Sequence, residues 1–202
     1  MHAPHSQASF GQTETQHRPR GPDHLAPDCA GANFYAIDRS LRDLLQAYLA
    51  PEDFRQFEPH FHRLGALAGG RLDELAGIAD KHPPVLNARD RFGRDEDWID
   101  YHSSYREMEN IAFGDFQFHA MSHRAGTLET DRPLPAVAKY ALQYLFVQAE
   151  FGLMCPISVT DTSIHLIRKF AGAELRDYLL PKMLSGDVAT LWKGTQDRKS
   201  VV

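Results

Sequence analysis

The feature that most constrains this chain is a long apolar segment, LPAVAKYALQYLFVQAEFGLMCP, which spans residues 134–156. Its polar residues Lys139, Gln143 and Glu150 lie roughly along one stripe of a helix, and the remaining directions are apolar. A helix that is apolar nearly all round is normally buried in the middle of a protein. We therefore predict one helix of about twenty residues at the centre of a helical bundle. Its aromatic residues are expected in the core: Tyr140, Tyr144, Phe146 and Phe151.

Two amphipathic helices are predicted near the start of the ordered chain. Asp38 is a good N-cap, and apolar residues follow it at helical spacing up to Leu49. Pro51 ends that helix and suits the first turn of the next one, whose apolar face includes Phe54, Phe57 and Phe61.

Prolines and glycines are expected to punctuate this helical region. Pro59 predicts a kink or a split in the second helix, and Gly69-Gly70 predicts its end. A third helix over residues 71–82 then runs into Pro83 and Pro84, which cannot continue it.

One stretch, residues 84–102, favours β-structure. Phe92-Gly93 is a plausible turn, and Trp98 to Tyr101 could form the returning strand. Two strands alone are marginal in water, so we expect this hairpin to lie on helices. Ser104 with Glu107 resembles a capping box that opens the next helix.

The last part of the chain predicts two more helices and then a change of pattern. Thr160 or Asp161 is expected to cap a helix that ends before Gly172, and another helix follows over residues 173–186. Residues 187–196 resemble a turn that leads into a strand beginning near Leu191. The fold class is therefore an all-α helical bundle, residues 31–186, with one small β-hairpin and the start of a β-domain.

Residues 1–30 are rich in His, Gln, Pro, Gly and Ser, and are expected to form a flexible tail. The formal net charge of −5 argues weakly against broad binding of nucleic acids. With two cysteines there is no disulfide framework, and no apolar run reaches the ~18 residues of a membrane span. We expect a cytoplasmic protein with no membrane partner.

The sequence contains few candidates for metal ligands or for a catalytic nucleophile. His60 and His62 would lie on different faces of a helix, whereas His119 and His123 would align but still need a further ligand. Cys155 has no base or cation close in sequence, so packing is the favoured role. We predict no metal ligands and no catalytic residues.

A family resemblance appears after residue 150. The stretch FGLMCPISVTDTSIHLIRKFAGAELRDYLLPKMLSGDVATLWKGTQ resembles the FAD-dependent acyl-CoA dehydrogenase family. In that family a helix of the form E-L-x-x-x-Y-L-x-P-x-L-x-S-G precedes the first strand of a β-domain. Residues 174–186 supply this pattern, with an extra residue between Tyr178 and Pro181 compared with many members.

A second stretch, KHPPVLNARDRFGRDEDWIDYHSSYREM, resembles the branch that contains the bacterial DNA-alkylation-response flavoproteins. The shared features are a His-Pro-Pro entry at residues 82–84, a turn around Asp90 and Gly93, and the step Tyr101-His102. The opening NFYAIDRSLRDLL is similar too, and the resemblance as a whole covers about residues 31–196.

The resemblance implies an N-terminal helical domain of a flavoprotein that dehydrogenates acyl-CoA thioesters with FAD, as a homotetramer. The family's flavin motif and catalytic carboxylate would come after Gln196, so no catalytic or flavin-binding residue is carried over, and this chain is expected to be inactive. The segment CPISVTDT lines the acyl pocket in the family, so Ser158 and Thr160 are candidate substrate-binding residues. A plain helix cap is the other reading of Thr160.

Two alternatives stay open. One is a DNA-associated protective role, with DNA bound through a C-terminal region that this chain lacks. The other is a free-standing helical interaction module. For the end of the chain, a nucleotide string that encodes Asp-Arg-Lys-Ser-Val-Val and a stop resembles a widely used sequencing adapter. Residues 197–202 are therefore expected to be a non-native tail.

Overall fold

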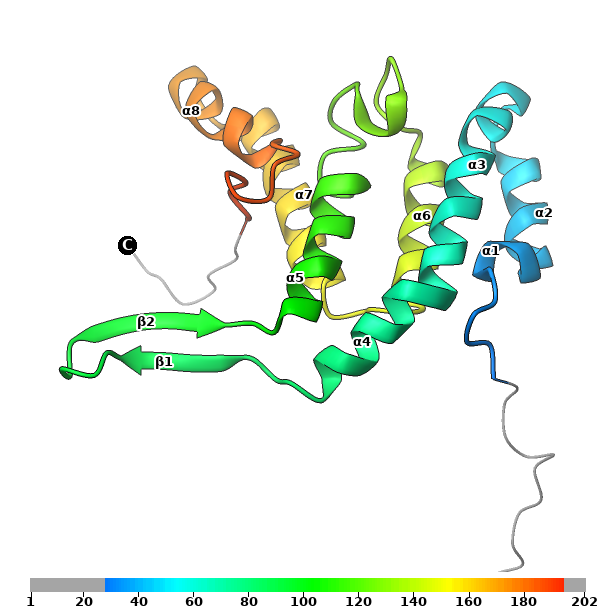
Figure 1. Ribbon diagram of the computed structural model, residues 1–202. Coiled ribbons are helices and arrows are strands. Elements are labelled where there is room, and N and C mark those ends of the chain that lie inside the picture. Colours follow the sequence, from blue (N-terminus) through cyan, green and yellow to red (C-terminus); the bar gives the residue numbers. More distant parts are fainter. Residues whose placement is uncertain (1–27, 195–202) are drawn as a thin grey trace, which may run out of the picture.

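Helices and one pair of strands make up residues 28–194, the part of the chain that the computed structural model describes (Figure 1). The helices are α1 Phe34–Ile37, α2 Arg39–Tyr48, α3 Pro51–Leu67, α4 Asp73–Asp80, α5 Ser103–Glu109, α6 Ala136–Val147, α7 Met154–Phe170 and α8 Ala173–Met183, and the strands are β1 Val85–Arg89 and β2 Asp95–Asp100. The prediction of an all-α fold with one small hairpin is confirmed. None of the described helices is both long and apolar enough to cross a bilayer.

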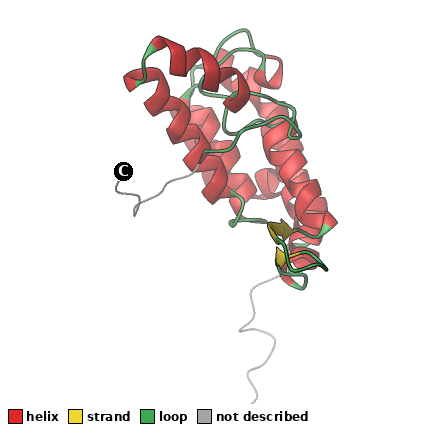
Figure 2. Cartoon of the chain, turned by 90° about the vertical axis from the view of Figure 1, so that its left-hand side faces the viewer, coloured by secondary structure: helices red, strands yellow, loops and turns green. Residues whose placement is uncertain are grey.

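The core lies between the long helices, which run roughly alongside one another (Figure 2). Helix α6 contacts both α2 and α3, as expected for the most apolar segment of the chain. Aromatic side chains dominate the interior: Phe57, Phe61, Phe113, Phe116, Phe118 and Phe146 are all fully buried. The rings of Phe118 and Phe146 meet edge to face with centroids 5.2 Å apart, a favourable geometry for an aromatic pair.

The start of α2 and the start of α3 follow the sequence signals. The Asp38 side chain accepts a hydrogen bond from the Leu41 amide at 2.8 Å, which satisfies one of the unpaired donors of the first turn. Pro51 occupies the first turn of α3, where its missing N–H costs nothing. Both predictions are confirmed.

The predicted split at Pro59 and the predicted stop at Gly69-Gly70 are wrong. Helix α3 continues through Pro59, which is exposed, so the carbonyl that loses its donor lies on the solvent side. At Gly69 the chain passes through a π-helical turn, Ala68–Leu72, directly into α4. A Cβ on Gly69 would lie 1.8 Å from the carbonyl oxygen of Ala32, so this glycine permits close backbone packing and does not end the helix.

The hairpin exists where predicted, but it does not lie on helices. Strands β1 and β2 pair antiparallel, and Gly93 in the turn has a φ of +81°. Almost every hairpin residue is exposed, and Figure 1 shows the strands projecting from the end of the bundle. The turn residues predict the hairpin correctly. Whether the hairpin packs on helices depends on residues distant in the sequence, so that part could not be predicted.

Helix α5 begins differently from the prediction. The His102 ring, not Ser104, caps it, because Nδ1 of His102 accepts from the Ser104 amide at 3.2 Å. Glu107 does not reach back to the cap and instead pairs with Arg71, whose Nε donates to it at 2.8 Å. The capping box is therefore wrong.

The long apolar segment is divided between two helices. Helix α6 ends at Val147, residues 148–153 turn, and α7 begins at Met154. The Glu150 side chain accepts from the Leu153 amide at 3.1 Å and so supports the turn. The predicted twenty-residue helix and the predicted helix start at Thr160 or Asp161 are both wrong, because α7 runs through these residues without a break.

Two predicted features at the ends of the chain cannot be followed, because residues 1–27 and 195–202 lie outside the described residues. These are most of the tail over residues 1–30 and the non-native tail over 197–202. Residues 191–194, where the strand of a β-domain was expected to begin, do not form a strand in the described part.

Candidate functional site

The candidate site is a seam where residues 191–194 lie against helix α7. The Thr160 side chain is fully buried. Its hydroxyl donates to the carbonyl oxygen of Pro156 at 2.7 Å and accepts from the Gly194 amide at 3.0 Å. A hydroxyl that bonds back to the preceding turn is common for threonine inside a helix. Here the same oxygen also holds the backbone of a distant segment.

Gly194 fits this seam because it has no side chain. A Cβ at this position would lie 2.4 Å from Oγ of Ser163 and 3.0 Å from Cα of Thr160. A Cβ would also lie 2.8 Å from Cβ of Ser163, so a larger residue requires Ser163 or the segment itself to shift. We call the contacts among Thr160, Ser163 and Gly194 the α7 seam.

An ion pair fixes the residue before Gly194 to helix α5. The Lys193 ammonium contacts the Glu109 carboxylate, whose side chain is almost completely buried. Arg106 donates to the other oxygen of that carboxylate at 2.7 Å. A buried carboxylate needs such partners, because an unpaired one would lose its hydration without compensation. Burial, followed by the Glu109 charge, raises the pKa of the neighbouring Tyr105 to about 12, so its phenol stays protonated.

Helix α8 also contacts residues 192–194, through Trp192. The Trp192 amide donates to the carbonyl oxygen of Lys182 at 3.1 Å. The Lys182 ammonium lies 3.3 Å from the ring centroid of Tyr178 and 4.2 Å from that of Trp192, which are cation–π distances. Residues 192–194 are therefore held by α5, α7 and α8 together.

A buried histidine connects the end of α8 to the core. His119 is fully buried, and its Nε2 donates to the carbonyl oxygen of Ser185 at 3.0 Å. Burial lowers the pKa of His119 to about 4, so the ring is neutral at pH 7. It acts as a hydrogen-bond donor in the packing of α8, and no metal role is needed to explain it.

The two predicted substrate-binding residues are in different surroundings. Ser158 is exposed on the surface of α7, whereas Thr160 is buried with its oxygen used by Pro156 and Gly194. Cys155 and Ser158 are exposed one turn apart at the start of α7, and Phe151 is exposed in the turn that precedes this helix. The prediction that Cys155 is packed is wrong, because its side chain is exposed.

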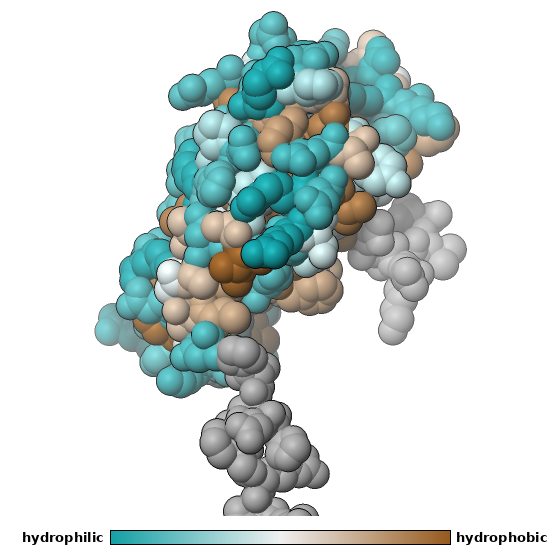
Figure 3. Space-filling view, turned by 90° about the vertical axis from the view of Figure 1, so that its right-hand side faces the viewer, coloured by the Kyte–Doolittle hydropathy of each residue, from teal (hydrophilic) through white to brown (hydrophobic). Residues whose placement is uncertain are grey.

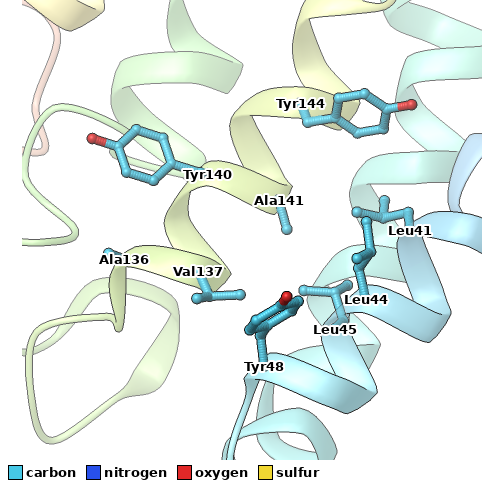
Figure 4. Close-up of a pocket in the computed structure, with 9 residues that line it drawn as sticks. All are labelled: Leu41, Leu44, Leu45, Tyr48, Ala136, Val137, Tyr140, Ala141 and Tyr144. Atoms are coloured by element: carbon cyan, nitrogen blue, oxygen red, sulfur yellow. The ribbon is translucent and has the colours of Figure 1, made fainter.

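A second surface feature is an apolar groove between α2 and α6, with a volume of about 420 Å³ (Figure 4). Figure 4 shows the side chains of Leu44, Tyr48 and Val137 turned into the space between the two helices. Tyr144 reaches toward α2, and its hydroxyl donates to Asp38 at 3.0 Å. Apolar patches are visible among polar side chains on this side of the molecule (Figure 3).

The groove corrects the prediction that all four aromatic residues of the apolar segment are core. Phe146 is fully buried, but Tyr140, Tyr144 and Phe151 are exposed. The sequence did contain a sign that the two tyrosines would be exposed. A buried tyrosine needs a hydrogen-bond partner for its hydroxyl, and this favours a surface position.

Two features of the described residues bear on metal and flavin binding. Across residues 28–194 no group of three His, Cys, Asp or Glu side chains is arranged to hold a metal ion. FAD needs backbone N–H groups free to bind its pyrophosphate. The Gly69-Gly70 pair lies inside continuous helix with Gly69 packed against Ala32, so it offers no such cradle. The Gly69-Gly70 pair is therefore not a pyrophosphate site.

Comparison with solved structures places this fold. The structure of Bd2924 in its apo form matches with a TM-score of 0.72 and 26% sequence identity, over 81% of this chain and 32% of that one. The Caenorhabditis elegans protein ACDH-11, solved in complex with C11-CoA, matches with a TM-score of 0.70 and 15% identity, over 93% of this chain and 31% of that one. The chain thus spans about a third of the length of these two proteins.

Comparison of the sequence with curated proteins finds no match. Residues 25–188 match the family described as the adaptive response protein AidB N-terminal domain, which is more than half of the chain. This match confirms the resemblance to the DNA-alkylation-response branch at the level of the N-terminal helical domain, and ACDH-11 shares the fold. The chain belongs to the AidB N-terminal domain family.

Proposed function

We propose that this chain is the helical part of an FAD-dependent acyl-CoA dehydrogenase-like oxidoreductase, and that it supplies scaffold and one wall of an acyl pocket. The observation that carries the proposal is the α7 seam. Together with the Lys193–Glu109 ion pair and the hydrogen bond from Trp192 to Lys182, it holds residues 192–194 against α7, α5 and α8. These contacts would fix where the following part of such a protein starts relative to α7.

The start of α7 is the proposed wall. Cys155 and Ser158 present two small side chains on α7, and Phe151 in the preceding turn adds an exposed aromatic ring. A small residue leaves room for an acyl chain, and an aromatic residue gives it apolar surface. Thr160 is buried behind this wall, where it accepts the hydrogen bond from Gly194. Of the two candidate residues, we therefore assign substrate contact to Ser158.

The substrate class is proposed to be acyl-CoA thioesters. ACDH-11 was solved with C11-CoA, and it has this fold. From the family resemblance we also propose a cytoplasmic, homotetrameric protein whose flavin and catalytic carboxylate are supplied outside residues 28–194. The chain by itself is proposed to bind no FAD tightly and to have no dehydrogenase activity.

An NMR titration of the purified chain tests the proposed wall. We expect a medium-chain acyl-CoA to shift amide signals of residues 151–158 weakly, while free CoA at the same concentration shifts them much less. Ser158→Phe should abolish the difference by filling the space, whereas Ser40→Phe, on α2, should not. Equal shifts with acyl-CoA and CoA would contradict the wall.

A further inference from the structure

A cationic hollow lies at the end of the bundle where α6 begins and α7 approaches its end. Two adjoining hollows of about 500 and 250 Å³ share the residues Ser122, His123, Lys139, Tyr140 and His165 in their lining. Volumes in this range are typical of small-molecule sites. Neither the α7 seam nor the proposed acyl wall uses any of these residues.

The base of this hollow is a buried ionic network. The Lys139 side chain is 5% exposed, and its ammonium donates to Asp161 at 2.5 Å and to Ser122 at 3.2 Å. His123 contacts the other Asp161 oxygen at 2.7 Å. Although burial alone would raise it, hydrogen bonds from His123 and Lys139 lower the pKa of Asp161, so this carboxylate is charged at pH 7. Both of its oxygens are occupied by cationic or N–H groups.

The ammonium of Lys139, which lines the hollow, can donate one more hydrogen bond than the network uses. An ammonium has three N–H bonds, and within the described residues two of those on Lys139 have partners. The Asp161 oxygens are already used, so the hollow presents donors to a ligand and few acceptors. A divalent cation would find no free carboxylate here, whereas an anion would find an ammonium.

The rim adds further positive charge. Arg168 and His165 lie one turn apart on α7, and both line the larger hollow. One Arg168 nitrogen donates to the carbonyl oxygen of His123 at 2.6 Å, which positions the guanidinium at the rim with its other donors available. Lys139 and Arg168 against Asp161 give a net charge of +1 before either histidine is protonated.

We propose that this hollow binds an oxyanion of the phosphate type through Lys139, Arg168 and His165. A phosphate group accepts several hydrogen bonds at once, which matches the ammonium, the guanidinium and the hydroxyl group of Thr162. The apolar side of the hollow, Leu134 with the Tyr140 ring, has room for the organic part of a phosphate ester. This goes beyond the proposed function, because it involves neither acyl group nor flavin.

Calorimetric titration of the purified chain tests the site, with inorganic phosphate and adenosine monophosphate as probes. Ionic strength is held constant with sodium chloride. We expect saturable binding of at least one probe, weakened by about tenfold or more in Arg168→Gln, which removes the cationic donor, and weakened in His165→Ala, which removes the ring donor. Lys169→Gln is the matched control, because Lys169 is the neighbouring exposed cation and its ammonium lies near the Phe170 ring.

The two probes distinguish the source of the phosphate. Tighter binding of the nucleotide, lost in Tyr140→Ala, would identify a phosphate ester, and equal binding of both probes would identify free phosphate. The proposal is overturned if neither probe saturates, if Lys169→Gln weakens binding as much as Arg168→Gln, or if acetate binds as tightly as phosphate. Circular dichroism of each variant checks that the fold is retained.

Discussion

The amide of Gly194 donates a hydrogen bond of 3.0 Å to the hydroxyl of Thr160 in the middle of α7. This contact joins the last described residue of the chain to helix α7. Thr160 was expected to cap the start of a helix, but it lies inside α7. Its hydroxyl donates to the carbonyl oxygen of Pro156 and accepts from the amide of Gly194.

Replacing Gly194 should loosen the seam. Gly194→Ala places a methyl group 2.4 Å from Oγ of Ser163, and we expect the free energy of unfolding to fall by about 1–3 kcal/mol, or residues 191–194 to detach. Gly172→Ala is the control, because a Cβ there meets nothing within 4 Å. Chemical denaturation and amide exchange of residues 191–193 measure both effects. Equal behaviour of the two variants would rule out a tight seam.

The pair Glu109 and Lys193 should be energetically coupled. A double-mutant cycle with Glu109→Gln and Lys193→Gln is expected to give a coupling of about 1–2 kcal/mol, because the carboxylate is buried. The exposed pair Arg89 and Asp95 on the hairpin should give less than about 0.5 kcal/mol in the same assay. Similar values for both pairs would mean that Lys193 is not anchored to α5.

The stability of the domain should depend on pH through His119. Its pKa is about 4 in the folded chain and near 6.5 when the chain unfolds, so between these values the unfolded state binds more protons. Unfolding free energy should therefore fall as pH drops from 6.5 to 4, by up to roughly 1.4 kcal/mol per pH unit. His119→Gln keeps a donor for Ser185 but cannot titrate, so its slope in this window should be smaller. Urea denaturation at a series of pH values provides the measurement, and identical slopes would contradict the assignment.

The hairpin should contribute little to the stability of the helices. Its residues are almost all exposed, so replacing residues 85–100 with a short Gly-Ser linker should leave the melting temperature within about 4 °C. Circular dichroism of the helical signal measures this. A larger decrease would show that the hairpin packs on the bundle in solution.

The DNA-associated alternative makes its own prediction. A DNA-binding domain shows affinity for duplex DNA that falls steeply with salt. With a net charge of −5, we expect no salt-sensitive retardation of a DNA duplex by this chain. A clear shift that disappears at higher salt would favour the DNA-associated role.

Local signals in the sequence were sufficient for several elements. Asp38 before an apolar helical pattern, and Gly93 in a turn between two β-like runs, each satisfy backbone requirements that neighbouring residues define completely. The helix start and the hairpin turn could therefore be predicted. The family resemblance supplied the domain type, which periodicity alone does not specify.

Features that depend on distant contacts could not be predicted. The break between α6 and α7 has no proline at its centre, and the buried position of Thr160 depends on Gly194. Tyr140 and Tyr144 seemed to be core residues because α6 is so apolar, yet their hydroxyls are better satisfied at the surface of a groove. Burial of Lys139 requires Asp161 from another helix.

We propose that this chain supplies helical scaffold and one wall of an acyl pocket, and that the flavin is bound outside residues 28–194. The most direct test is the absorbance spectrum of the purified chain after incubation with excess FAD and removal of unbound cofactor. We expect the purified chain to show no flavin absorbance at a stoichiometric level. A yellow protein that retains one FAD per chain would contradict it.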